Sequence, residues 1–435
     1  MPTSAVFCTR AVRLPCTKQL YCGMFRRQTY LPSILDELSR ARYIGFMSES
    51  ARPSSHSTGR TASPMAVFAV FLAVGTRAFG GPAAQISALS TEFIHERQWI
   101  SVERFRRALA VCQILPGPEA HEMCCYLGVL RSGRIGGVMA GLGFMLPGLV
   151  LMLIASIAYD SVNLREPAIA GAMMAMQVAA TALIVRATVR LAHTLAAGRL
   201  LACTLIIAMC VTLAWSMLGT TRVDHIEHSA RAVSVPELFG HGLVAGLVSF
   251  GGAYTSIPYV AGIACGPNGW MSEAAFLDGV ALAGVLPAPL VIFGTFVGYQ
   301  GHGVWGALAF TAGIFLPAFT FIVAGFRVLE RVIASSRVRL LLDLAGATAV
   351  GVIAATAIGL VLRSVFAFDV ASFARGTIAP LPSDTALRAI LFIVLMTYFF
   401  RIKGRFAVPL AMLSAAMIGA GFGACSLLAA DMNPQ

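Results

Sequence analysis

Apolar stretches long enough to cross a lipid bilayer recur along most of this chain. A hydrocarbon core about 30 Å thick requires roughly 20 helical residues. We find eleven candidates, at 65–90, 108–130, 135–159, 167–185, 200–220, 238–264, 279–300, 303–326, 344–362, 386–400 and 406–430. Because lipid offers no partners to backbone polar groups, such stretches form helices. The sequence therefore predicts an all-α polytopic membrane protein with about 10–11 transmembrane helices.

The composition agrees with this fold class. Of the 435 residues, 57% are hydrophobic and 12% charged, and the formal net charge is +12. A basic excess of this size can indicate a nucleic-acid-binding protein. Here, however, the arginines lie at the ends of apolar stretches, as they do in membrane proteins. We therefore expect a lipid bilayer around the chain and no nucleic acid as partner.

Residues 1–64 precede the first apolar stretch and carry half of the net charge. We expect a disordered N-terminal extension, because no part of it is apolar enough to span a bilayer. Its Arg-rich, acid-poor composition is typical of organelle transit peptides. A start codon placed upstream of the true one is the alternative. We expect the plasma membrane as the location, with an organelle membrane as the alternative.

The apolar part of the chain contains an internal repeat. A shift of 171 residues aligns Gly75, Phe79, Gly80, Gly81, Pro116 and Pro118 with Gly246, Phe250, Gly251, Gly252, Pro287 and Pro289. A shift of 170 aligns Gly128, Gly133, Gly136, Gly143 and Pro147 with Gly298, Gly303, Gly306, Gly313 and Pro317. Such agreement indicates a duplication. We expect a first repeat at 65–220, a connecting loop at 221–237 and a second repeat at 238–435.

Duplicated membrane proteins with matching helix breaks are usually transporters, whose repeats surround a site near the bilayer midplane. An odd number of spans in the first repeat makes the second enter the membrane from the other side. We therefore expect inverted repeats.

Two kinds of helix break recur in both repeats. Consecutive glycines, Gly80-Gly81 before Pro82 and Gly251-Gly252, can expose backbone N–H groups to an anion. A close helix crossing is the alternative explanation for them. The second break, Pro116-Gly117-Pro118 and its counterpart Pro287-Ala288-Pro289, removes backbone donors and ends a helix. The next helix then starts with the positive end of its dipole at the break, which suits an anionic substrate.

Ionisable residues inside the predicted spans are few. A charge at the bilayer centre costs about 2.5–3.5 kcal/mol on insertion scales, so each is a functional candidate. Arg77, expected mid-span and buried beside the first glycine pair, could attract an oxyanion. Glu119, His121 and Glu122 follow the proline break and are candidates for proton coupling. A simple helix cap is the alternative role for Glu119.

A metal centre is the rival interpretation of the acidic and histidine residues. The stretch 224–228 reads Asp-His-Ile-Glu-His, but flanking arginines favour a solvated connecting loop. Glu119, His121 and Glu122 around a metal would make a membrane-embedded enzyme, yet no ligand set with metal spacing recurs. We expect no metal, no cofactor and no catalytic residues.

Together the motifs resemble the chromate ion transporter family in its long, two-domain form. The runs that carry the resemblance are FGGPAAQI from Phe79, HERQWIS from His95, LPGPEA from Leu115, LVSFGGAYTSIP from Leu247 and VLPAPLVIFGTFVGY from Val285. The resemblance covers about residues 66–330. It places the family's motif positions on Gly80, Gly81, Pro82, Pro116, Gly117, Pro118, Glu119, Gly251, Gly252, Pro287 and Pro289. Arg77 departs from the family pattern, so its role is inferred from its position alone.

The resemblance implies an oxyanion carrier that exports chromate, with sulfate as the physiological analogue. The sequence has no GxxxxGK[ST] nucleotide-binding loop. We therefore expect alternating access driven by the membrane potential or an ion gradient. A transporter of sulfate or another tetrahedral oxyanion is the alternative. The sequence does not decide whether the protein forms a homodimer.

Overall fold

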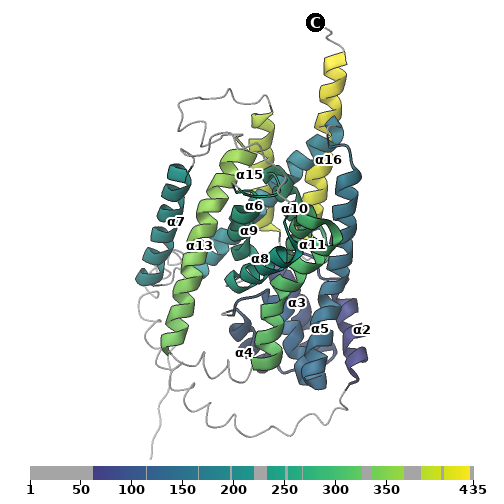
Figure 1. Ribbon diagram of the computed structural model, residues 1–435, viewed down its shortest axis with the longest axis vertical. Helices are drawn as coiled ribbons and strands as arrows, with labels where there is room; N and C mark the ends of the chain where they lie inside the picture. Colours follow the sequence, from purple (N-terminus) through teal and green to yellow (C-terminus); the bar gives the residue numbers. More distant parts are fainter. Residues whose placement is uncertain are drawn as a thin grey trace, which may run out of the picture. The chain divides into compact units, whose positions relative to one another are not determined.

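Helices make up the regular structure of the part of the protein that the computed structural model describes (Figure 1). The described residues are 62–113, 115–164, 166–195, 198–219, 233–249, 253–266, 268–325, 336–366, 384–402 and 406–431. Residues 1–61 of the predicted N-terminal extension, the stretch 224–228 and the glycine pair Gly251-Gly252 lie outside them. The prediction of an all-α fold is confirmed over the described part.

The helices of the first half follow the predicted spans, with breaks at the predicted glycines and prolines. They are α2 (Pro64–Gly75), α3 (Gly81–Ser90), the π-helical turn η1 (Thr91–Glu96), α4 (Val102–Cys112), α5 (Glu119–Ser161), α6 (Pro167–Leu195) and α7 (Arg199–Gly219).

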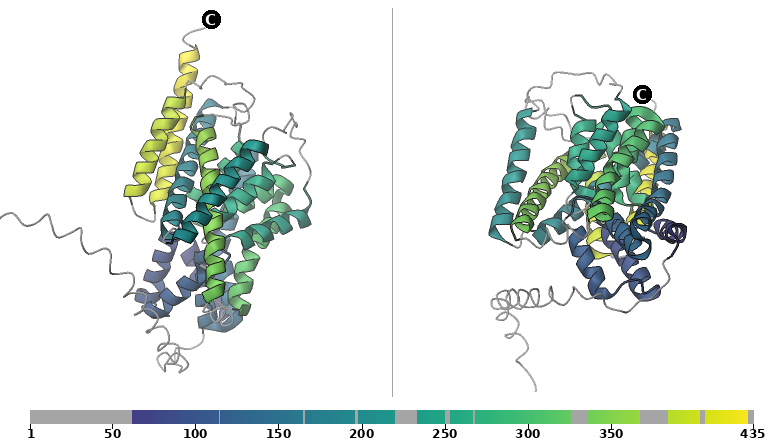
Figure 2. Two further views of the ribbon diagram at one scale, coloured as in Figure 1. Left: turned by 90° about the vertical axis from the view of Figure 1, so that its left-hand side faces the viewer. Right: turned by 60° about the horizontal axis from the view of Figure 1, so that its bottom comes forward.

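The second half has the same order of short and long helices. It comprises α8 (Val235–Val248), the short turn η3 (Ala253–Thr255), α9 (Ser256–Ala264), α10 (Glu273–Val285), η4 (Leu290–Ile292), α11 (Phe293–Phe319), η5 (Thr320–Ala324), α13 (Ser336–Ser364), α15 (Thr385–Arg401) and α16 (Ala407–Asp431). In the views of Figure 2, α15 and α16 run side by side, in agreement with their contacts.

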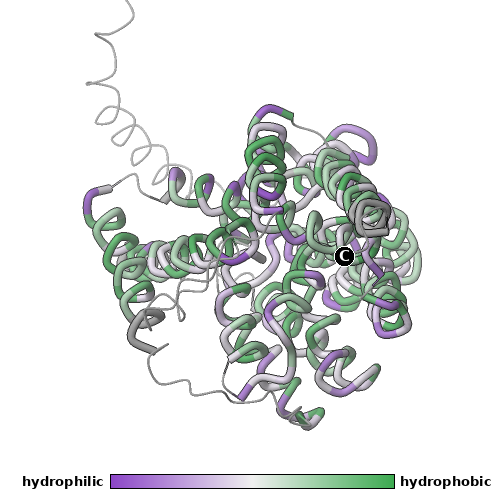
Figure 3. Tube along the Cα trace, turned by 90° about the horizontal axis from the view of Figure 1, so that it is seen from above, coloured by the Kyte–Doolittle hydropathy of each residue, from purple (hydrophilic) through white to green (hydrophobic). Residues whose placement is uncertain are grey.

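Five helices of the described part are long and apolar enough to cross a membrane. They span Glu119–Ser161, Pro167–His193, Leu290–Ala324, Asp343–Ser364 and Ala407–Cys425. Hydrophobic residues predominate along the helices in Figure 3. Four stretches predicted as single spans are divided: 65–90 and 238–264 each contain two or more shorter helical segments, and the proline breaks interrupt 108–130 and 279–300. The chain is thus a multi-pass integral membrane protein.

The two longest apolar spans, Glu119–Ser161, which is α5, and Leu290–Ala324, which contains α11, each fold back on themselves. The backbone of α5 leaves helical geometry at Ser132 and at Gly133, where φ is 64°. That of α11 does so at His302 and at Gly303, where φ is 56°. Only glycine adopts such positive φ values without strain. Each element is therefore a helical hairpin, which accounts for its being too long for one crossing.

Glycines also hold the two arms of each hairpin together. A Cβ built on Gly128 would collide with the carbonyl oxygen of Gly136, and one on Gly298 with that of Gly306. In a straight helix, residues eight positions apart would be about 12 Å apart. The close approach of the arms therefore requires residues without side chains.

A short helix packs against the second arm of each hairpin. In the first half α2 packs on α5, where Gly75 contacts the backbone carbonyl of Phe144. In the second half α8 packs on α11, where Gly246 contacts the carbonyl of Ile314. The contacts match at positions that the 171- and 170-residue shifts align. Outside the two units that α2 forms with α5 and α8 forms with α11, α7 lies beside α13 (Figure 1).

Candidate substrate-binding site

The glycine break of the first half separates α2 from α3. Gly80 and Gly81 have φ values of 94° and 78°, in the left-handed region that side chains disfavour. Helix α3 begins at Gly81, with Pro82 in its first turn. Pro fits there because the first backbone N–H groups of a helix have no internal partner. The predicted helix break at these glycines is confirmed.

The proline breaks also lie where the sequence predicts them. Helix α4 ends at Cys112 and α5 begins at Glu119, directly after Pro118. Helix α10 ends at Val285, and the next turn, η4, begins at Leu290, directly after Pro289. Helix starts therefore follow the proline break in each half.

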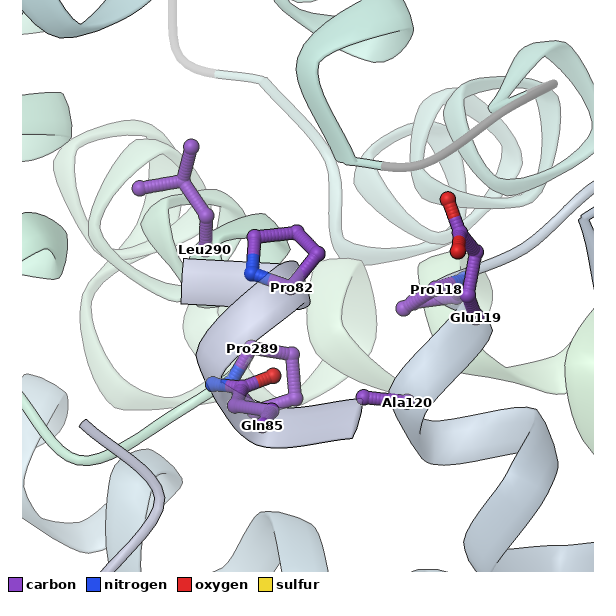
Figure 4. A pocket seen from close by; sticks show the side chains of 7 residues that line it. All are labelled: Pro82, Gln85, Pro118, Glu119, Ala120, Pro289 and Leu290. Carbon is purple, nitrogen blue, oxygen red and sulfur yellow. The ribbon is translucent and has the colours of Figure 1, made fainter. Parts of the chain in front are cut away.

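These breaks from both halves meet at one small pocket. Figure 4 shows Pro82, Gln85, Pro289 and Leu290 facing Pro118, Glu119 and Ala120, and these seven side chains line it. The enclosed space of the pocket is about 10 Å³, which is room for about one water molecule. Four of the predicted residues, Pro82, Pro118, Glu119 and Pro289, thus share one pocket.

Gln85 connects the two halves inside this pocket. Its side chain is 2% exposed, and its Nε2 donates to the carbonyl oxygens of Ala78 at 2.9 Å and of Ala288 at 2.8 Å. Its Oε1 is buried and has no hydrogen-bond partner among the described residues. A buried acceptor without a partner is costly and is free to bind a donor. Sequence analysis missed Gln85, although a Gln inside an apolar stretch is a usable signal.

A second set of contacts joins the proline break of each half to the other half. The backbone N–H of Gly117 donates to the carbonyl oxygen of Ser249, 2.9 Å away. A Cβ built on Gly117 would lie 3.1 Å from the Cβ of Ala318. Conversely, a Cβ built on Gly148, in the hairpin α5 of the first half, would collide with Ala288 in the proline break of the second half. Each proline break thus packs against the long hairpin of the other half.

Glu119 lies at the first position of α5 and is partly buried. A carboxylate is stabilised there by the positive end of the helix dipole. Glu119 lines the pocket, but α5 has Pro118 at its N-cap and no side-chain cap hydrogen bond, so Glu119 is not its cap.

Glu122 and His121 lie deeper in the same helix and are fully buried. Neither carboxylate oxygen of Glu122 has a hydrogen-bond partner among the described residues, and a Cβ on Gly117 would lie 2.5 Å from its Oε1. His121 packs against the rings of Phe315 and Phe319, with centroids 4.8 and 4.7 Å away. In the described residues, no group of three or more His, Cys, Asp or Glu could hold a metal ion.

The prediction that Arg77 is buried mid-span is wrong. Helix α2 ends at Gly75, and Arg77 lies in the following turn, where its N–H donates to the carbonyl oxygen of Val74. Its side chain is exposed and does not line the pocket. The reason is that helix α2 ends at Gly75, before the glycine pair, so Arg77 lies in the connecting turn and not in the helix.

Comparison with known proteins decides the family. A family described as Chromate transporter matches residues 65–223 and 236–420. The chain belongs to the chromate transporter family. A chromate transport protein of Pseudomonas aeruginosa is 43% identical over 358 residues, which cover 72% of this chain and 86% of the relative. One from Cupriavidus metallidurans is 25% identical over 346 residues, 71% of this chain and 85% of the relative.

A probable chromate transport protein of Synechococcus elongatus is 25% identical over 289 residues, 57% of this chain and 72% of the relative. No solved structure matches this member of the chromate transporter family. The predicted resemblance is confirmed. Relatives named as transport proteins indicate a transporter rather than an enzyme, and family membership supports chromate transport.

Proposed function

We propose that this chromate transporter family member exports chromate by binding it in the pocket between its two halves. The observation that carries the proposal is the pocket itself, because breaks from both halves line it. Broken helices that offer N-terminal ends to a central space are typical of transporters that bind anions.

The binding groups that we propose are the backbone and side chains of the breaks. In the first half these are Gly80, Gly81, Pro82, Pro116, Gly117, Pro118 and Glu119, and in the second half Gly251, Gly252, Pro287 and Pro289. Gln85 joins them through its unpartnered buried oxygen, which can accept from a protonated oxyanion or from water. The exposed Arg77 attracts the ion toward the pocket instead of binding it.

Alternating access is the mechanism that the reciprocal contacts favour. We propose that residues 65–220 and 238–435 are inverted repeats, related so that each proline break packs on the hairpin of the other. The matched glycine contacts of α2 with α5 and of α8 with α11 support two equivalent rigid units. Rocking of such units about a fixed site opens it to each side of the membrane in turn.

The driving force is the membrane potential, an ion gradient, or both. In the plasma membrane, an interior-negative potential of about 100 mV favours export of a dianion by about 4.6 kcal/mol. That free energy supports a concentration ratio of about a thousandfold. Glu119, His121 and Glu122 are the candidates for proton coupling. Glu122 is favoured among them, because a fully buried carboxyl without partners is costly to keep charged.

Transport of labelled anions into inside-out membrane vesicles tests the proposal. We expect uptake of chromate that excess sulfate inhibits, because the pocket distinguishes charge and shape rather than the central atom. Uptake of sulfate with no effect of chromate would favour the alternative, a transporter of sulfate. Indifference to both anions would overturn the proposed function.

A further inference from the structure

The pocket lacks the positive charge that a divalent anion requires. Its seven lining residues include the acidic Glu119 and no Lys or Arg. The nearest cation that sequence analysis predicts, Arg77, is exposed. Dipoles of helix ends supply partial charge only. A dianion next to a carboxylate therefore needs full cations from elsewhere in the fold.

Tyr254 lies on an element that contacts both helix α6 and a turn of the pocket. It lies in η3, which contacts both η4, the turn that begins with the pocket residue Leu290, and α6. Its hydroxyl oxygen lies 3.7 Å from a Cβ built on Gly81, at the start of α3. The phenol thus connects the first glycine break with α6.

Two arginines of α6 lie on the other side of Tyr254. Arg186 and Arg190 are four residues apart, so they share one face of the helix. Arg186 is partly buried, and Arg190 is exposed. Both lie within electrostatic reach of the Tyr254 hydroxyl. Both also lie inside the apolar span Pro167–His193, where cations are rare and mark ion pathways.

The guanidinium of Arg186 packs against an aromatic ring, but one of its N–H groups has no hydrogen-bond partner among the described residues. The guanidinium carbon lies 5.7 Å from the centre of the Phe399 ring, a cation–π contact with α15. Its Nε is buried and has no hydrogen-bond partner among the described residues. A guanidinium offers paired donors that match the oxygen atoms of an oxyanion. The Arg186 guanidinium is therefore oriented by the ring, and its Nε has no acceptor within the described part of the chain.

We infer that Arg186 and Arg190 form the cationic side of the oxyanion path, with Tyr254 between them and the glycine break at Gly81. This inference rests on the proposed function, and it names the residues that select a divalent tetrahedral oxyanion by charge. The Tyr254 hydroxyl donates a hydrogen bond to the passing anion. The arginines supply the positive charge that the pocket lacks. The sequence gives no repeat counterpart for the pair, so the path is asymmetric.

Chromate uptake by proteoliposomes, measured against chromate concentration, tests the inference. We expect Arg186→Gln and Arg190→Gln each to raise KM at least about tenfold, which corresponds to losing one charge-assisted hydrogen bond. Arg186→Lys should restore part of the affinity, because it keeps the charge but not the paired donors. Tyr254→Phe should raise KM less than either arginine change.

The matched control is Arg199→Gln, which removes the same charge from the exposed start of α7. We expect it to leave KM unchanged. If Arg186→Gln fails to fold, the KM values of Arg190→Gln and Arg186→Lys still test the inference. Wild-type values of KM in all three arginine variants of α6 would overturn the inference while leaving the proposed function intact. Absence of uptake by the wild-type protein would instead overturn the proposed function.

Discussion

The side-chain amide of Gln85 in α3 donates to the carbonyl oxygen of Ala288, 2.8 Å away and 203 positions further along the chain. One buried side chain therefore joins the glycine break of the first half to the proline break of the second. The bond lies at the pocket that both breaks line. Any movement of one half against the other during transport must break or carry this hydrogen bond.

Gln85→Leu should destabilise the protein and impair transport. The change leaves the carbonyl groups of Ala78 and Ala288 without this donor, at a cost of about 1–3 kcal/mol for each buried group. Thermal unfolding of the purified protein and chromate uptake measure the two effects. Gln300→Leu is the control, because Gln300 donates to the exposed Asp160. Equal effects of the two changes would contradict the role of Gln85.

Gly117→Ala should abolish chromate uptake. Gly117 has a φ of 154°, and a Cβ there would lie 2.5 Å from the Glu122 carboxylate and 3.1 Å from Ala318. Overpacking of this kind costs about 1–3 kcal/mol, and it would separate the proline break from α11. The control Gly359→Ala adds the same methyl group in α13, where no atom lies within 4 Å. Normal uptake by Gly117→Ala would show that the break tolerates displacement.

Gly128→Ala and Gly298→Ala should have similar effects on stability. In each, the new methyl group collides with a backbone carbonyl of the facing hairpin arm, that of Gly136 or Gly306. Gly262→Ala in α9 is the control, because it has no neighbour within 4 Å. Thermal unfolding compares the three variants. A large effect in one hairpin and none in the other would contradict the equivalence of the two halves.

Glu122→Gln should uncouple transport from pH. The amide has nearly the same shape as the carboxyl group but cannot carry a proton, so the buried site stays filled. We expect chromate uptake by the variant to be the same with and without an imposed pH gradient, whereas the wild-type protein responds to it. An unchanged response would exclude Glu122 as the proton carrier and leave Glu119 and His121.

Arg77→Gln should slow uptake at low ionic strength and have little effect at high ionic strength. Arg77 is exposed, and salt screens exposed charges over about 10 Å at 0.1 M. Initial rates at two salt concentrations separate attraction of the ion from binding. An equal loss at both would mean that Arg77 binds the substrate directly.

The helix breaks and the long hairpins could be predicted from sequence to different degrees. Glycine and proline act locally, so the starts of α3 and α5 follow from Gly81 and Pro118. The hairpin turns at Gly133 and Gly303 also follow from the sequence, because separate spans are predicted on either side of them, at 108–130 and 135–159 and at 279–300 and 303–326. The sequence does not predict how closely the two arms of each hairpin pack.

The site was predicted as a set of breaks but not as a pocket. Which break meets which depends on the packing of one half on the other, so the contact of Gln85 with Ala288 has no sequence signal. Arg77 was misplaced because its position relative to the end of α2 decides its exposure. Arg186 was missed because the predicted span 167–185 ends one residue before it, although α6 continues to Leu195.

Flux of radiolabelled chromate in proteoliposomes at a set membrane potential tests the central claim most directly. The claim is that an oxyanion crosses the membrane through the pocket between the two halves. We predict that wild-type protein and Gly359→Ala move chromate away from the negative side, with a rate that grows with the potential and falls with added sulfate, and that Gly117→Ala does not. Equal chromate flux in liposomes with wild-type protein, with Gly117→Ala and without protein would contradict the account.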